Sequence, residues 1–219
     1  MRKAIVQGMD GRRSYDDPCG TARALDVVGE RWALLVVREL LLGPKRFSDL
    51  ARSLPGTSQN VLSQRLRELV DARVVRRHRL GPPVSAQVYE LTGRGHALRP
   101  VVVELGRWGS RIPAVTGGEL SPDAFVIALL TTFDGSPGTC AVELRIDGDM
   151  FAVTLADGAV DVARGAPTRP DAVLTGSAAA VRGVVFGGAP LTDLDVRGDR
   201  AAAERFVRAF PRPVPWPAT

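Results

Sequence analysis

Residues 47–91 restrict the fold of this chain more than any other stretch, because two helical patterns, a turn and an alternating pattern follow one another in a fixed order. The segments FSDLARSL and QNVLSQRLRELVDA both carry apolar residues at helical spacing, and Pro55-Gly56 separates them. Proline lacks the N–H that a helix needs and glycine favours turns. The pattern therefore predicts two short helices joined by a tight turn, with Thr57 or Ser58 as the cap of the second.

The second of these helices is predicted to have one apolar and one polar face. On a helical wheel, Leu62, Leu66 and Leu69 fall together and would dock the helix on a core. Asn and Gln side chains on the opposite face can form paired hydrogen bonds with adenine, and Arg can do so with guanine. An ordinary solvated helix face can have the same composition, so this face alone leaves both interpretations open. The candidate DNA contacts of this helix are Ser58, Gln59, Asn60, Ser63, Gln64 and Arg67.

After Ala72 the hydrophobic period changes from that of a helix to the two-residue period of a strand. The segments RRHRL and VSAQVYEL flank Gly81-Pro82-Pro83, which predicts a β-hairpin with a stiff tip. Arginines on such a hairpin can lie along DNA phosphates or enter the minor groove, although a charge run is also typical of a solvated strand. Beside the polar helix, the hairpin indicates a winged helix-turn-helix that binds duplex DNA. Its candidate phosphate contacts are Arg76, Arg77 and Arg79.

Apolar helices are predicted on both sides of this segment. Before it, the stretch RWALLVVRELLLG carries apolar side chains around much of its circumference, so we expect a buried helix with Trp32 as a core aromatic. After it, Thr92 should cap a long helix that Pro100 kinks. We expect the apolar stripe of this last helix to pair with a second copy of the chain, which would set two recognition helices about one DNA turn (~34 Å) apart. The stripe consists of Leu98, Val101, Val102, Leu105 and Trp108.

Charge is divided unevenly along the 219 residues. Residues 1–112 carry 20 Lys and Arg against 11 Asp and Glu, a net charge of +9, whereas the remainder carries 9 against 13, a net charge of −4. A basic half joined to an acidic half indicates that only the first meets a polyanion. Pro, Gly-Gly and Ser-Pro interrupt the pattern near 112–122. We therefore predict two domains, residues 1–112 and 121–219.

Composition argues against several other classes of protein. Two cysteines, Cys19 and Cys140, and two histidines are too few for a disulfide framework or a typical zinc site. No apolar run reaches the ~18 residues of a membrane helix, and the N-terminus lacks the apolar core of a secretion signal. We therefore expect a cytoplasmic protein with no cofactor, no metal and no membrane partner.

The second half is predicted to be an α+β domain. Ser121-Pro122 opens an apolar helix, and alternating strands follow with Asp147-Gly148 and Asp157-Gly158 at two hairpin turns. Ser177 and Asp199 would cap two later helices. The expected architecture is an antiparallel sheet with helices on one face. No nucleophile elbow, phosphate loop or acid–base pair is recognisable, so we expect no enzyme.

Residues 19–109 resemble the HxlR-type winged-helix regulators of bacteria, relatives of the MarR fold. The likeness is carried by a cysteine at the start and by GERW, LLLGPKRFSDL, NVLSQRLREL and YELTGRGHAL in that order. The resemblance implies a homodimeric transcription factor whose helix from Ser58 reads the major groove and whose hairpin is the wing. It also implies that Cys19 can be a sensor of oxidants or electrophiles. A small buried thiol is the other interpretation of a free cysteine.

Residues 121–210 resemble sterol-carrier-protein-like domains, through DAVLTGSAAAVRGVVFGG and DLDVRGDRAAAERF. This resemblance implies an apolar tunnel that accepts acyl chains or other lipids. The same residues could instead form a solid core. The candidate cavity residues are Phe125, Leu129, Phe133, Phe151, Val153, Val185, Phe186 and Phe206.

The prediction for the whole chain is a homodimeric DNA-binding transcriptional regulator whose C-terminal domain senses an apolar ligand. The alternative is a carrier of lipid or another hydrophobic ligand, whose basic N-terminal domain binds a protein or a membrane. A carrier should have no preferred DNA sequence, so sequence-specific binding to duplex DNA separates the two hypotheses.

Overall fold

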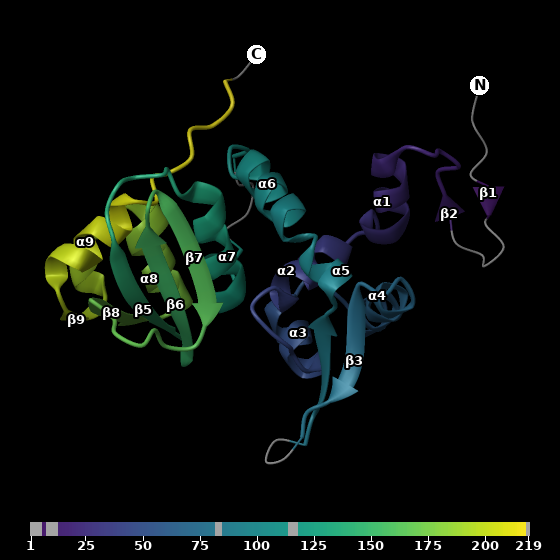
Figure 1. Cartoon of the computed structure of the whole chain (residues 1–219), viewed down its shortest axis with the longest axis horizontal. Helices are drawn as coiled ribbons and strands as arrows, with labels where there is room; N and C mark the ends of the chain where they lie inside the picture. The colour runs from purple at the N-terminus through teal and green to yellow at the C-terminus, as the bar shows by residue number, and fades with distance from the viewer. Residues whose placement is uncertain (1–5, 8–12, 82–84, 114–117, 218–219) are drawn as a thin grey trace. The chain divides into compact units, whose positions relative to one another are not determined.

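The computed structural model describes residues 6–7, 13–81, 85–113 and 118–217. The chain divides into two compact units, Met1–Leu98 and Arg99–Thr219 (Figure 1). This division falls before helix α6 (Arg99–Gly109), whereas the sequence analysis placed that helix in the first domain. The described residues include no helix with the length and apolar character that a membrane crossing requires.

The first unit consists of short helices and a two-stranded wing. Its elements are β1 (Val6–Gln7), β2 (Arg13–Ser14), α1 (Gly20–Val28), α2 (Ala33–Leu40), α3 (Phe47–Ser53), α4 (Gln59–Asp71), β3 (Val75–Arg79), β4 (Gln87–Leu91) and α5 (Gly93–His96). Two predicted caps are confirmed: the Ser58 hydroxyl accepts the Val61 N–H, and the Thr92 hydroxyl accepts the Gly95 N–H. Each cap satisfies a backbone donor that the first turn of a helix leaves unpaired.

The core of the first unit lies where α2, α3 and α4 meet the base of the hairpin. The predicted leucine stripe of α4 is confirmed, since Leu62, Leu66 and Leu69 are all buried. β3 and β4 pair antiparallel, from Val75 beside Leu91 to Arg79 beside Gln87. Helix, turn, helix and hairpin in this arrangement form a winged helix-turn-helix. The other buried residues at this junction are Val36, Val37, Leu40, Leu50, Val74 and Val88.

Trp32 is not the core aromatic that the sequence predicted. Its φ of 79° is left-handed, and α2 begins only at the following residue. The helical pattern continues through GERW, but this backbone turn separates that segment from α2, so the Trp32 side chain is half-buried beside the turn between α3 and α4. There a Cβ at Gly56 would come within 2.9 Å of the indole. Trp32 therefore packs against the Pro55-Gly56 turn.

The long helix expected after Thr92 is two helices, α5 and α6, because the chain leaves the helical path at Ala97 and Leu98. The Leu98 N–H donates to the Gly95 carbonyl, which makes a tighter turn than an α-helix. Pro100 supplies no N–H that could continue the α-helical pattern across this point. The predicted kink is therefore a complete break.

The described residues of the second unit form one five-stranded sheet, four α-helices and a 3₁₀ turn. They are α6, α7 (Pro122–Thr132), β5 (Cys140–Ile146), β6 (Asp149–Ala156), β7 (Ala159–Arg164), β8 (Ala172–Gly176), α8 (Ala178–Gly187), the 3₁₀ turn η1 (Leu191–Asp193), β9 (Asp195–Gly198) and α9 (Arg200–Arg208). The predicted hairpin turns are confirmed, because Asp147, Gly148, Asp157 and Gly158 all have positive φ. Ser121, Ser177 and Asp199 cap α7, α8 and α9 as predicted.

The sheet is mixed, so the expectation of an antiparallel sheet was wrong for one pair of strands. The strand order is β7-β6-β5-β8-β9, and β8 runs parallel to β5, from Ala172 beside Val142 to Gly176 beside Ile146. After two hairpins the chain leaves β7 at one edge and returns on the other side of β5. Residue alternation has a period of two in both kinds of sheet, so it could not reveal this crossover.

Helices α7, α8 and α9 cover one face of the sheet (Figure 1). The candidate cavity residues lie in this layer: Phe125, Leu129, Phe151, Val153, Val185 and Phe206 are buried, and Phe133 and Phe186 are half-buried. The rings of Phe125 and Phe186 are 5.3 Å apart. A solid core would show the same burial and ring contact, so the apolar tunnel stays a prediction.

An ion pair between the partly exposed Arg164 and the buried Asp123 fixes α7 to the sheet. Arg164 of β7 donates to both carboxylate oxygens of Asp123, at 2.5 and 2.6 Å, and stacks on the Phe151 ring. Burial alone would lower the pKa of Arg164, but its hydrogen bond to Asp123 and the charges of Asp123 and Asp149 outweigh burial and raise the pKa. Breaking such a pair leaves a buried charge without compensation, so this contact holds the first turn of α7 in place.

Substitution of two glycines in α5 can test how closely this helix approaches the backbone at the start of the wing. A Cβ at Gly95 would meet the Val74 carbonyl oxygen at 2.2 Å, whereas a Cβ at Gly93 would meet no atom within 4 Å. We predict that Gly95→Ala lowers the free energy of unfolding by about 3 kcal/mol, while Gly93→Ala changes it by less than about 0.5 kcal/mol. Urea unfolding followed by circular dichroism measures both. Equal effects of the two substitutions would contradict the close approach.

Candidate nucleic-acid interface

The outward face of α4 carries the predicted base-reading side chains. Gln59, Asn60, Gln64 and Arg67 are exposed, and Ser63 is half-buried. Residues 60, 63, 64 and 67 share one side of the helix, opposite the buried leucines. The Gln64 amide donates to the Glu68 carboxylate at 3.1 Å, a hydrogen bond within the exposed surface of the helix. The helix thus presents amide, hydroxyl and guanidinium groups together, which is the arrangement needed for contact with base edges.

Arg65 behaves differently from the other arginine of this helix, Arg67. It is only 7% exposed, and it forms ion pairs with Glu68 and, at 3.7 Å, with Glu30. The contact with Glu30 attaches α4 to the segment that precedes α2. The sequence pattern gives no sign of this role, because a helical wheel alone does not show which charges meet a partner from another segment.

The three arginines of the wing lie on two faces of the hairpin. Side chains alternate along a strand, so Arg77 and Arg79 share one face and Arg76 lies on the other. Arg76 is neutralised by Glu90, at 2.6 Å. In the described part of the chain, no acidic side chain pairs with Arg77 or Arg79. These two arginines are therefore the stronger candidates for phosphate contacts. Pro82 and Pro83 of the predicted tip lie outside the described residues.

Arg77 is held in position by residues that the sequence analysis missed. Its guanidinium donates to the Gln87 side chain at 3.0 Å and lies over the Tyr89 ring, 5.9 Å from the centroid. The Tyr89 backbone in turn exchanges two hydrogen bonds with Lys45, at 2.8 and 3.0 Å. The strand register, which places Tyr89 opposite Arg77, is the signal that could have identified these neighbours.

Lys45 links the wing to the helices. Its ammonium group is 2.9 Å from the carboxylate of Glu39, which is completely buried in α2. The backbone of the same residue pairs with β4. One residue thus connects α2, the start of α3 and the wing, which fixes the wing relative to the helix-turn-helix.

Cys19 lies at the N-cap position of α1 and is exposed. Its sulfur accepts the Ala22 N–H at 3.3 Å, and its own N–H donates to Asp17 at 2.9 Å. Cys140 differs, because it is buried in β5 and burial raises the pKa of its thiol. A thiol must be accessible and deprotonated to react, so only Cys19 has the accessibility that a sensor needs.

The predicted apolar stripe divides between a covered and an exposed face of α6. Val101, Leu105 and Trp108 are 50%, 49% and 56% exposed. Val102 is buried on the side of the helix that also carries Gly106, and a Cβ at Gly106 would come within 2.7 Å of Thr131 of α7. Leu98 precedes α6 and is half-exposed in the first unit. Only the exposed residues of α6 are free to meet another chain.

The comparisons with known proteins concern this part of the molecule. The model of the HxlR-like helix-turn-helix family matches residues 27–115. The transcriptional regulator YvaP of Bacillus subtilis is 39% identical over 88 residues, which are 40% of this chain and 82% of YvaP. YodB of the same organism is 35% identical over 88 residues, which are 40% of this chain and 79% of YodB.

A crystal structure of quinone-bound YodB is similar with a TM-score of 0.36 and 34% identity, and the match covers 42% of this chain and 97% of that structure. The two sequence relatives are named transcriptional regulators of the helix-turn-helix type, and the match to each spans most of its length. The chain therefore belongs to the HxlR-like helix-turn-helix family.

Proposed function

We propose that this chain is a homodimeric transcriptional regulator that binds duplex DNA through α4 and the β3–β4 wing. The observation that carries the proposal is the outward polar face of α4 beside a wing whose Arg77 and Arg79 lack acidic partners among the described residues. Membership of a family whose relatives are named transcriptional regulators supports it. So does the net charge of +9 on residues 1–112.

In this mechanism α4 enters the major groove and the wing contacts the backbone. Asn60, Gln64 and Arg67 read base edges, because their amide and guanidinium groups match the donor and acceptor patterns exposed there. Ser58 caps this helix, Gln59 and Ser63 lie on it, and the three complete the proposed contact surface. Arg77 and Arg79 bind phosphates and set the register, whereas Arg76 contributes less because Glu90 already neutralises it.

An apolar ligand in the second unit is the proposed regulatory input. The aromatic layer around Phe125, Phe151 and Phe206 supplies the apolar surroundings that such a ligand needs. A ligand can change DNA affinity only if it binds the free and the DNA-bound arrangements with different affinities. The carrier hypothesis predicts no sequence preference for DNA, so the following experiment also tests it.

The first experiment tests whether α4 reads bases while the wing binds phosphates. A preferred duplex is selected from a random library, and its binding is then measured by fluorescence anisotropy at several salt concentrations. We predict that Arg77→Ala weakens binding to all duplexes similarly and reduces the slope of log K against log salt by about 1. Gln64→Ala should instead change the preference at one base pair by about 1–3 kcal/mol. Both contacts would be wrongly assigned if the two variants had equal effects on the selected duplex and on a mutated one.

Arg76→Ala is the matched control for Arg77→Ala. It removes the same charge from the neighbouring residue, but it also frees Glu90, so the salt slope should change less than in Arg77→Ala. A larger change in the Arg76 variant would place the phosphates on the opposite face of the wing.

The exposed face of α6 is the proposed dimer contact. We predict that Leu105→Asp shifts the chain from dimer to monomer in sedimentation velocity, because a carboxylate would be desolvated at the centre of the stripe. Arg107→Ala, on the opposite side of α6 from Leu105, should leave the sedimenting mass unchanged. A dimer that persists in Leu105→Asp would exclude this helix as the main contact.

Cys19 is the proposed site of reaction with an electrophile, and benzoquinone is a suitable probe because YodB has been crystallised with a quinone. The Cys19 thiolate would add to a ring carbon of the quinone, and proton transfer would restore an aromatic hydroquinone thioether. We predict that benzoquinone releases DNA from the wild type with a mass gain of one quinone, and that Cys19→Ser abolishes both effects. Serine retains an N-cap oxygen for α1.

Cys140→Ser is the control for this experiment and should respond to benzoquinone like the wild type, because Cys140 is buried. Undiminished DNA release from the Cys19 variant would show that Cys19 is not the sensor.

A further inference from the structure

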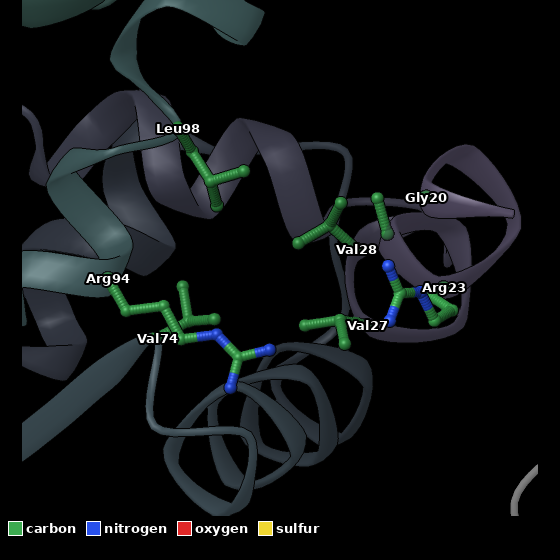
Figure 2. A pocket seen from close by; sticks show the side chains of 8 residues that line it. Gly20, Arg23, Val27, Val28, Val74, Arg94 and Leu98 are labelled. Carbon is green, nitrogen blue, oxygen red and sulfur yellow. The ribbon is translucent and has the colours of Figure 1, made fainter.

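The first unit contains a pocket of about 360 Å³ that the proposed DNA contacts do not use. All eight residues that line it lie between Gly20 and Leu98, so the pocket belongs to this unit alone. Figure 2 shows that α1 forms one wall, while Arg94 of α5, Leu98 and Val74 form the opposite side. Its volume is within the range of pockets that hold small organic molecules.

Two arginines project into this pocket from opposite sides (Figure 2), Arg23 from α1 and Arg94 from α5. Neither forms a salt bridge within the part of the chain that the structure describes, and no acidic residue is among the eight that line the pocket. Gly20 is the first residue of α1, whose first turn has no acidic residue either, so the helix dipole adds positive potential at the same wall. The polar groups of the pocket therefore favour an anion.

The rest of the lining is apolar. Val27 and Val28 of α1 face Val74 and Leu98 across the pocket (Figure 2). A fully hydrated ion such as inorganic phosphate would leave these side chains without a favourable contact. A ligand with an apolar body and one anionic group would satisfy both parts of the lining.

We propose that this pocket binds a small amphipathic carboxylate, with its apolar body against Val27, Val28, Val74 and Leu98 and its carboxylate between Arg23 and Arg94. Guanidinium groups form charge-assisted hydrogen bonds with carboxylates, often in pairs. The site is distinct from the aromatic layer of the second unit. It also does not depend on the proposed DNA binding, because none of its lining residues is a proposed DNA contact.

Isothermal titration calorimetry of the full chain with 2-naphthoate tests the proposal, and 2-naphthalenemethanol serves as a neutral control with the same rings. We expect one 2-naphthoate per chain, and affinity for the alcohol that is lower by about tenfold or more, because the alcohol cannot form the charge-assisted bonds. Equal affinities for the two compounds, or no binding of 2-naphthoate to the folded chain, would overturn the proposal.

Single charge-removing substitutions then locate the site. Arg23→Gln and Arg94→Gln should each weaken 2-naphthoate binding by about fivefold to tenfold. Arg73→Gln removes a charge from another exposed arginine of the same unit that does not line the pocket, so its affinity should equal that of the wild type. If the three variants bound alike, the anion would be attracted only by the general charge of the unit.

A second copy of the chain is the other possible occupant of the pocket. Ala24→Phe adds a ring on α1 at the pocket wall, and we expect it to block 2-naphthoate without changing the sedimenting mass. A changed mass together with unchanged 2-naphthoate affinity would assign the pocket to a contact between chains and refute the proposal. No DNA is present in these experiments, so their failure is distinguishable from failure of the DNA-binding proposal.

Discussion

Lys45 connects helix α2 to the β3–β4 wing and holds the two in one arrangement. Its ammonium group pairs with the buried Glu39 of α2, and its backbone exchanges both hydrogen bonds with Tyr89 of β4. Tyr89 in turn lies beneath the guanidinium of Arg77. An ion pair buried in the core is costly to break, because the remaining charge would lack both water and a partner. The position of Arg77, the proposed phosphate contact on the wing, thus depends on a charge pair in the helical core.

Local charge pairing also decides which arginines are available for other molecules. Arg65 and Arg76 are occupied by acidic neighbours, and Arg164 is bound to Asp123 in the second unit. A paired guanidinium has less to gain from a phosphate or a carboxylate, because it must first lose its partner. The net charge of the first half therefore overstates its binding capacity. The arginines available to bind an anion are the ones without acidic partners in the residues that the structure describes, on the wing and in the pocket between α1 and α5.

Helix α6 shows how one apolar stripe can serve two contacts. The side of α6 that carries Val102 and Gly106 packs within the second unit. Val101, Leu105 and Trp108 remain exposed. Because Gly106 has no side chain, α6 can approach Thr131 of α7 closely. The exposed half of the stripe is an apolar surface of the kind that commonly marks a contact with another chain.

Residue pattern alone determined the order of the elements. The leucine stripe of α4, the caps at Ser58 and Thr92, and the Asp-Gly hairpins follow from side-chain chemistry that acts within a few residues, and all of them were predictable. Tertiary structure decided the rest. The left-handed turn at Trp32, the parallel pairing of β8 with β5, the partners of Arg65 and Arg76, and the pocket between α1 and α5 all bring together residues distant in the chain or depend on backbone geometry. Periodicity shows which face of an element is apolar, but it does not show which other element packs against that face. The chemistry of both proposed sites depends on how the elements pack together.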